Sequence, residues 1–155
     1  MKAHEIMIRQ VHKVKETDTL RDVIEKFIKY RISGLPVVNE RNEIVGYISD
    51  GDIMRYIGHR EDFVLDAFYF SAVMSMNEGE YDDRTRRLLG RNVMELSRKK
   101  VVAVSQDEDV AHIAGLLGRK QIKKVPVHRG GVLVGIISRG DVIRHSFGSY
   151  LTEER

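Results

Sequence analysis

Two short segments of the chain carry residue types that could bind a phosphorylated sugar. Each has the pattern Ser-x-Gly-Asp after an apolar run, at Ser49–Asp52 and at Ser138–Asp141. A serine hydroxyl and the unpaired amides at the start of a helix can donate hydrogen bonds to a phosphate. An aspartate carboxylate can accept hydrogen bonds from both hydroxyls of a ribose. The glycines Gly51 and Gly140 would let a ligand approach the main chain closely.

The same pattern also fits a purely structural role. Ser49 with Asp52, and Ser138 with Asp141, have nearly the spacing of a capping box, in which both side chains satisfy free amides at a helix start. From these residues alone, capping is the simpler interpretation. The two roles are compatible, because one serine can cap the helix and also contact a ligand.

Both segments belong to a longer internal repeat. The run Gly46–Arg55 nearly repeats as Gly135–Arg144, and the two prolines of the chain, Pro36 and Pro126, fall at equivalent positions. Apolar periodicity and turn residues predict the order strand, helix, strand, strand, helix in each copy. The expected strands are Val11–Lys15, Leu35–Val38 and Ile44–Ser49 in the first copy, and Val101–Val104, Val125–Val127 and Val132–Ser138 in the second.

The repeat divides the chain into four parts. The copies are expected at 6–58 and 92–145, with a helical linker at 59–91 and a tail at 146–155. A connection of this length with its own helices is not a passive tether. The linker is predicted to contain an aromatic helix over Phe63–Ala72 and a charged helix over Tyr81–Leu89.

Composition excludes several classes of protein. The 155 residues include no cysteine, so disulfides and thiolate metal sites are excluded. No apolar run is long enough for a membrane span or a signal peptide, and a cytoplasmic location is expected. The six histidines are scattered without a metal-binding spacing. The sequence contains neither a Walker loop nor a Gly-x-Ser-x-Gly nucleophile motif, so we predict that the protein is not an enzyme.

The charge distribution argues against nucleic-acid binding. The net charge is only +3, and the basic runs Arg84–Arg87 and Arg98–Lys100 are short. A nucleic-acid binder would favour a concentrated basic stripe. Both runs are interpreted as solvated surface, so a nucleic-acid partner is not expected.

The repeated Gly-x-x-Ser-x-Gly-Asp turn, the Pro-Val strands and the order of elements resemble a tandem pair of CBS domains, a Bateman module. The resemblance covers Ile6–Gly58 and Asn92–His145. It implies an α/β (α+β) fold of two β-α-β-β-α units, packed as a pseudo-twofold pair with two clefts. Such modules bind AMP, ADP, ATP or S-adenosylmethionine and regulate another protein. This chain would be a free-standing module, with a homodimer and an unknown regulated protein as its expected partners.

The resemblance assigns residues to both clefts. Lys123 and Lys124 come just before Pro126, and in the family the residues before this proline can face the phosphates of the ligand. Arg139 adds a positive charge at the position where the first copy has Asp50, and Asp50 would repel a phosphate. The main cleft is therefore expected at Thr17, Ile32, Ser33, Lys123, Lys124, Ser138, Arg139, Gly140 and Asp141. The second, weaker cleft is expected at Gly34, Ser49, Gly51, Asp52, Asp107 and Ile122.

The predicted function is a non-catalytic sensor of adenine nucleotides, and two alternatives stay open. One is a dimerisation module that binds no ligand, which predicts no change of melting temperature with any nucleotide. The other is a binder of S-adenosylmethionine. The cations assigned to the main cleft favour a ligand that carries phosphates.

Overall fold

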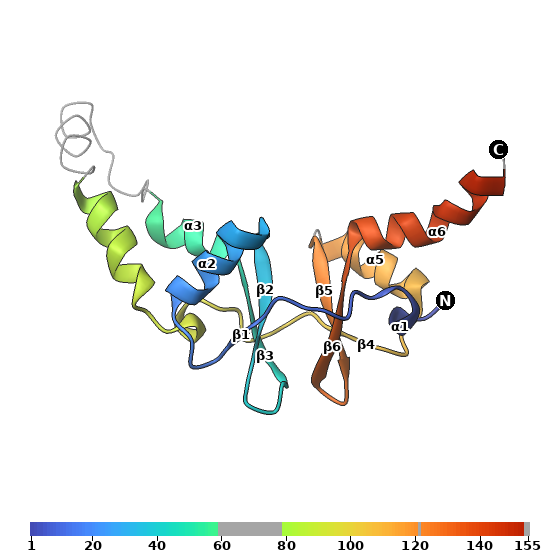
Figure 1. The fold of residues 1–155 in the computed structure, drawn as a ribbon, viewed down its shortest axis with the longest axis horizontal. Helices are drawn as coiled ribbons and strands as arrows, with labels where there is room; N and C mark the ends of the chain where they lie inside the picture. The colour runs from blue at the N-terminus through green and yellow to red at the C-terminus, as the bar shows by residue number, and fades with distance from the viewer. Residues whose placement is uncertain (59–78, 121, 154–155) are drawn as a thin grey trace.

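Two units with the same order of elements make up the structure (Figure 1). It is a computed structural model, which describes residues 1–58, 79–120 and 122–153. The first unit consists of β1 (Val14–Lys15), α2 (Leu20–Tyr30), β2 (Gly34–Val38), β3 (Ile44–Ser49) and α3 (Asp50–Ile57). The second consists of β4 (Val104–Ser105), α5 (Val110–Lys120), β5 (Lys124–Arg129), β6 (Val132–Ser138) and α6 (Arg139–Glu153). The predicted fold class is confirmed.

Each unit has one three-stranded sheet, and the two sheets have the same topology. Their strand orders are β1-β2-β3 and β4-β5-β6, with the first pair parallel and the second antiparallel. Val14 pairs with Val37 and Val104 with Val127, so the registers match across the repeat. The first strand of each unit is shorter than predicted. Only Val14–Lys15 of the first predicted strand joins the ladder, and the second strand, Val104–Ser105, keeps only Val104 of its predicted range and ends one residue later.

The sheets lie between the two groups of helices (Figure 1). All five residues of β2 are buried, whereas burial alternates along most of β6. A fully buried strand needs cover on both faces. The first core beneath α2 includes Leu35, Val37 and Ile48, and the second core beneath α5 includes Val125, Val127 and Ile137.

The segment that precedes each unit packs in the core of the other unit. Helix α1 (Ala3–Ile6) contributes Ala3 and Ile6 to the second core, whereas Val93 and Leu96, at the 3₁₀ turn η2 (Val93–Glu95), belong to the first. The predicted copies at 6–58 and 92–145 follow the repeat along the chain, so they differ from the packed units. Burial of short apolar segments against the opposite sheet accounts for the exchange.

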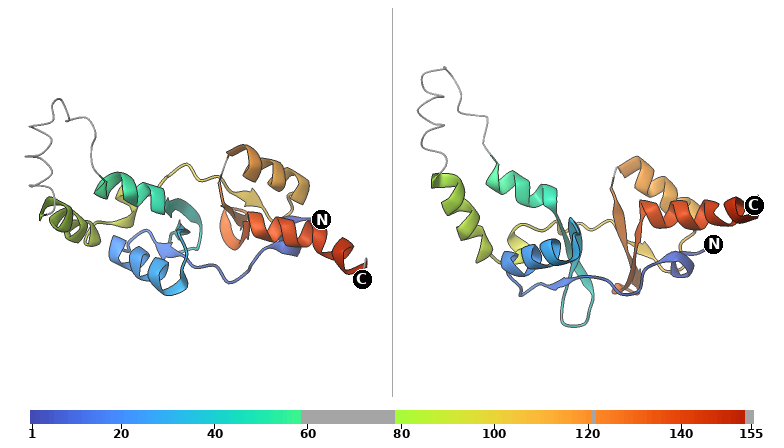
Figure 2. Two further views of the ribbon diagram at one scale, coloured as in Figure 1. Left: turned by 90° about the horizontal axis from the view of Figure 1, so that it is seen from above. Right: turned by 45° about the horizontal axis from the view of Figure 1, so that its top comes forward.

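Two crossing connections and the hairpin turns hold the units together. The chain crosses once between α1 and β1 and again between η2 and β4 (Figures 1 and 2). At the hairpin turns, the Ile44 amide donates to the Gly131 carbonyl (3.0 Å), and the Leu133 amide donates to the Asn42 carbonyl (2.8 Å). The units are therefore joined at the hairpin turns as well as by the connections.

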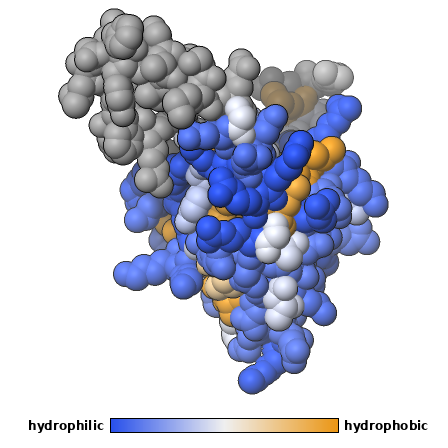
Figure 3. All heavy atoms as spheres, turned by 90° about the vertical axis from the view of Figure 1, so that its left-hand side faces the viewer, coloured by the Kyte–Doolittle hydropathy of each residue, from blue (hydrophilic) through white to orange (hydrophobic). Residues whose placement is uncertain are grey.

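Parts of the linker and the tail are also described. Residues 79–89 form a helix, which includes the predicted segment Tyr81–Leu89 and buries Leu88 in the first core. The helix predicted over Phe63–Ala72 lies outside the described residues. Helix α6 continues into the tail as far as Glu153. Hydrophilic residues dominate the face in Figure 3, and none of the described helices has the length and hydropathy to span a membrane.

Candidate functional site

Both Ser-x-Gly-Asp segments form the predicted helix caps. At the start of α3, Asp52 Oδ2 accepts hydrogen bonds from the Ser49 amide and the Ser49 hydroxyl, both at 3.0 Å. At the start of α6, Asp141 Oδ2 accepts the same bonds from Ser138, at 2.8 and 2.9 Å. The residues Asp52 and Asp141 are only 3% and 4% exposed. These bonds satisfy the main chain at each helix start and hold both carboxylates in place.

The second oxygen of each carboxylate contacts arginine. Asp52 Oδ1 accepts from Arg55, one turn later, and from Arg98 Nε at 3.3 Å. Asp141 Oδ1 accepts from Arg144 Nη2 at 2.7 Å. Burial raises the pKa of Asp141, but the bonds from Ser138 and Arg144 outweigh it and leave the pKa below its ordinary value. Asp141 is therefore a carboxylate at neutral pH.

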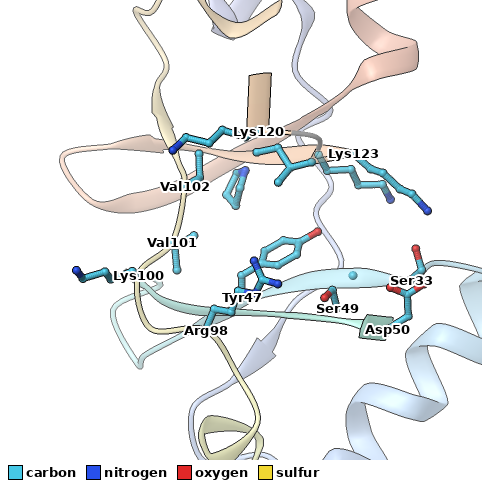
Figure 4. Close-up of a pocket in the computed structure, with 14 residues that line it drawn as sticks. Ser33, Tyr47, Ser49, Asp50, Arg98, Lys100, Val101, Val102, Lys120 and Lys123 are labelled. Carbon is cyan, nitrogen blue, oxygen red and sulfur yellow. The ribbon is translucent and has the colours of Figure 1, made fainter. Parts of the chain in front are cut away.

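A pocket of about 420 Å³ lies between the units, within the size range of small-molecule sites. The first unit, the connection between the units and the second unit all contribute to its wall (Figure 4). The lining residues are Ser33, Gly34, Tyr47, Ser49, Asp50, Arg98, Lys100, Val101, Val102, Lys120, Ile122, Lys123, Lys124 and Pro126.

The pocket brings together residues that the sequence assigned to different clefts. Ser33, Lys123 and Lys124 were expected in the main cleft, but they line the same pocket as Gly34, Ser49 and Ile122 of the second cleft. Gly34 and Lys124 are the first residues of β2 and β5, and both line this one pocket, which accounts for the mixture. Among the described residues, the wall does not include Thr17, Ile32, Gly51, Asp52, Asp107, Ser138, Arg139, Gly140 or Asp141.

Arg139 has a structural contact that the sequence did not reveal. Its Nε donates to the Ile122 carbonyl and its Nη2 to the Leu117 carbonyl, both at 2.9 Å. Carbonyls near a helix C-terminus lack partners within the helix, and a cation suits them. The guanidinium therefore binds the end of α5, which removes part of the charge argument for the Asp141 cleft.

Tyr47 lines the pocket and was not among the predicted residues. An added Cβ on Gly34 would lie 2.6 Å from the Tyr47 hydroxyl, so glycine at this position leaves room for the ring. Burial, with Asp50 and Asp52 nearby, raises the pKa of Tyr47 to about 12. Tyr47 is thus a neutral phenol at physiological pH. The signal in the sequence was the mismatch within the repeat, since Ile136 takes its place in β6.

The electrostatic character of the pocket comes mainly from residues outside the repeated turns. Arg98 and Lys100 belong to the run interpreted as solvated surface, and Lys120 ends α5. With Lys123 and Lys124 they place five basic side chains on the wall against the single acidic residue Asp50. Lys100 and Lys120 lie at one end, and Lys123 lies at the other end near Ser33 and Asp50 (Figure 4). Such a pocket attracts anions.

Two residues of the pocket wall, Val102 and Lys120, have different side chains at the corresponding positions of the first copy. Val102 corresponds to His12, and Lys120 corresponds to Tyr30, the last residue of α2. The rings of His12 and Tyr30 are stacked, with centroids 3.9 Å apart. Lys29 Nζ lies 5.3 Å from the Tyr30 centroid, within the range of a cation–π contact. An aromatic pair thus occupies positions that are aliphatic and cationic at the pocket.

Comparison with known proteins identifies the family and similar folds. The CBS domain model matches residues 3–59 and 93–148. The protein MJ1426 of Methanocaldococcus jannaschii is 33% identical over 138 residues, which cover 84% of this chain and 82% of that protein. Two other curated relatives are longer, and the chain spans 58% of each.

Two solved structures with bound ligands share the fold over nearly the whole chain. The structure of CBSX2 in complex with AMP has a TM-score of 0.71 at 22% identity and covers 99% of this chain and 98% of that chain. The CBS pair of protein MJ0100, in complex with 5′-methylthioadenosine and S-adenosylmethionine, has a TM-score of 0.65 at 21% identity and covers 96% and 98%. The chain belongs to the CBS domain family and carries two CBS domains in tandem.

Proposed function

We propose that this protein is a non-catalytic regulatory module that binds an adenine nucleotide between its two CBS domains. The observation that carries the proposal is the pocket itself, which combines the Ser49 helix cap with five basic side chains. The AMP complex of CBSX2 and the adenosine-based ligands of MJ0100 support the class of ligand. Ligand binding would bias the relative arrangement of the units, which a partner protein could then detect.

The wall of the pocket suggests which part of a nucleotide each group would bind. Lys123 and Lys124 would attract the phosphates, and the positive end of the α3 dipole next to Ser49 would add to that attraction. Val101, Val102 and Ile122 offer apolar contacts for the base. Asp52, whose carboxylate lies behind the wall, would accept the ribose hydroxyls. Because the cations repel a sulfonium group, the proposal favours a nucleotide over S-adenosylmethionine.

The Asp141 side is proposed as the second site. It retains the capped carboxylate and Ser138, with Gly140, Thr17 and Ile32 as further candidates, and Asp107 would serve the first site in the place of Thr17. The sequence predicts the main site at Asp141 and the weaker site at Asp52, so this proposal reverses their order. The reason is that the lysine pair lines the Ser49 pocket and Arg139 binds α5.

Titration calorimetry with AMP, ADP, ATP, adenosine and S-adenosylmethionine tests the proposal. We expect at least one nucleotide to bind, and we expect Asp52→Asn to weaken it about tenfold or more, since a hydrogen bond to a charged group is lost. Asparagine keeps an acceptor for Ser49, so the hydrogen bonds of the cap are weakened but can still form. Asp141→Asn is the matched control and should have the smaller effect.

Three outcomes would contradict the proposal. No heat and no rise in melting temperature with any adenine compound would favour the ligand-independent dimerisation module. A larger loss in Asp141→Asn than in Asp52→Asn would restore the original order of the clefts. Sustained turnover of ATP, detected by chromatography after incubation with the protein, would show that the protein is an enzyme.

A further inference from the structure

Asp52 differs from Asp141 in a contact that comes from outside its own helix. Both carboxylates accept from an arginine one turn later, Arg55 or Arg144. Asp52 Oδ1 also accepts from Arg98 Nε at 3.3 Å, and Arg98 belongs to the connection between the units. Among the described residues, no matching second arginine contacts Asp141.

Arg98 lies between the pocket and the buried carboxylate. Arg98 is on the pocket wall, whereas Asp52 is not. Its main chain is anchored to β3, because the Arg98 amide donates to the Tyr47 carbonyl (2.9 Å) and the Tyr47 amide donates to the Arg98 carbonyl (3.0 Å). Its side chain is 59% exposed. The guanidinium can therefore change partners while the main chain stays in place.

The hydrogen bonds of Asp52 leave no free position for a sugar. Each oxygen of a carboxylate has about two acceptor positions. Oδ2 accepts twice from Ser49, and Oδ1 accepts from Arg55 and Arg98. A ribose diol must displace one of these donors. Both arginine side chains are largely exposed, but only Arg98 lines the pocket, and its contact is long at 3.3 Å, so Arg98 is the donor that leaves.

We propose that Arg98 is a specificity-determining residue, which moves from Asp52 to a ligand phosphate when the ribose diol takes its place. The inference rests on the proposed nucleotide site. A ligand with a phosphate offers Arg98 a second anion, so the lost ion pair is replaced. A nucleoside without a phosphate breaks the pair without replacing it. The exchange makes the pocket discriminate against adenosine and 5′-methylthioadenosine.

The test compares Arg98→Met with Arg55→Met by titration calorimetry, with adenosine and ADP as the probes. Arg55 also contacts Asp52 but does not line the pocket, which makes it the matched control. In Arg98→Met we expect ADP to bind about tenfold more weakly, which equals ~1.4 kcal/mol, and adenosine to bind about threefold more tightly. In Arg55→Met both ligands should shift in the same direction, so the ratio of their affinities changes by less than about twofold.

The opposite signs separate a change of partner from simple damage to the fold. A structural defect in Arg98→Met would weaken both ligands together, and that result would overturn the inference while the nucleotide site stands. Unchanged ADP binding in Arg98→Met would overturn it as well. If the unmodified protein bound neither probe nor any other adenine compound, the proposed function and this inference would fail together. Thermal denaturation of each variant shows whether it is folded.

Discussion

The two CBS units have the same backbone fold, but side chains at corresponding positions make different contacts. In the first unit Asp50 follows the capping serine and Tyr47 lines a pocket, whereas in the second unit Arg139 binds the end of α5 and Ile136 replaces the tyrosine. The helix caps and strand registers are the same in both units. The repeat thus preserves what the fold needs, while the residues that could select a ligand have diverged.

The largest expected difference between the units lies at their paired glycines. An added Cβ on Gly135 would lie 2.5 Å from Met7 Sδ and 2.9 Å from Met7 Cβ. At Gly46 the nearest atoms are the Arg98 carbonyl oxygen at 3.3 Å and Ser97 Cβ at 3.4 Å. Because Met7 Cβ cannot move without its main chain, Gly135→Ala should destabilise the protein by about 3 kcal/mol through overpacking.

Gly46→Ala is the matched control and should cost less than about 1 kcal/mol, since small shifts relieve its contacts. Urea denaturation of both variants measures the difference. Equal losses would mean that α1 and its following residues are not held tightly against the second sheet, and would weaken the exchange of segments between the units.

The Asp141 cap should make the free energy of unfolding depend on pH in the acid range. Asp141→Asn is expected to lower the free energy of unfolding by about 2 kcal/mol at pH 7, because charge-assisted hydrogen bonds are weakened. The pKa of Asp141 is lowered in the folded state from an ordinary value of 3.8. Its contribution is therefore complete above that value and is lost as the pH falls toward the folded pKa.

Denaturation of the variant and the unmodified protein between pH 7 and about pH 3 measures this dependence. The difference in stability should stay constant down to about pH 5 and then shrink. Asp107→Asn, at an exposed carboxylate, should leave stability nearly unchanged throughout. A difference that grows toward acid pH would contradict the lowered pKa.

The smallest expected effect concerns Tyr47, which has no counterpart in the second unit. The folded pKa of about 12 exceeds the ordinary value of 10.0. Between these values the unfolded chain loses the proton and the folded protein keeps it, so stability falls as the pH rises. Tyr47→Phe should remove about 1 kcal/mol of this loss near pH 11. Alkaline absorbance titration should also show one late-ionising tyrosine fewer, and an unchanged titration would contradict the assignment.

Local patterns were enough to predict much of the fold and only part of the pocket. The repeat, the turn residues and the alternating apolar positions predicted the order of the elements, because strand and helix periods are local properties. Ser33, Ser49 and Lys123 were among the predicted residues that line the pocket. Arg98, Lys100 and Lys120 were missed, because a basic run has the same pattern whether it faces solvent or a cavity.

The amino-acid sequence by itself determined that the chain contains two CBS units with capped helices at Ser49 and Ser138, since those features depend on residues a few positions apart. Only the tertiary structure decided which side chains meet across the junction. The packing of 93–96 into the first core, the contact of Arg98 with Asp52 and the bonds of Arg139 to α5 all join distant segments. Such contacts depend on how two apolar cores are completed, and short-range spacing carries no record of that.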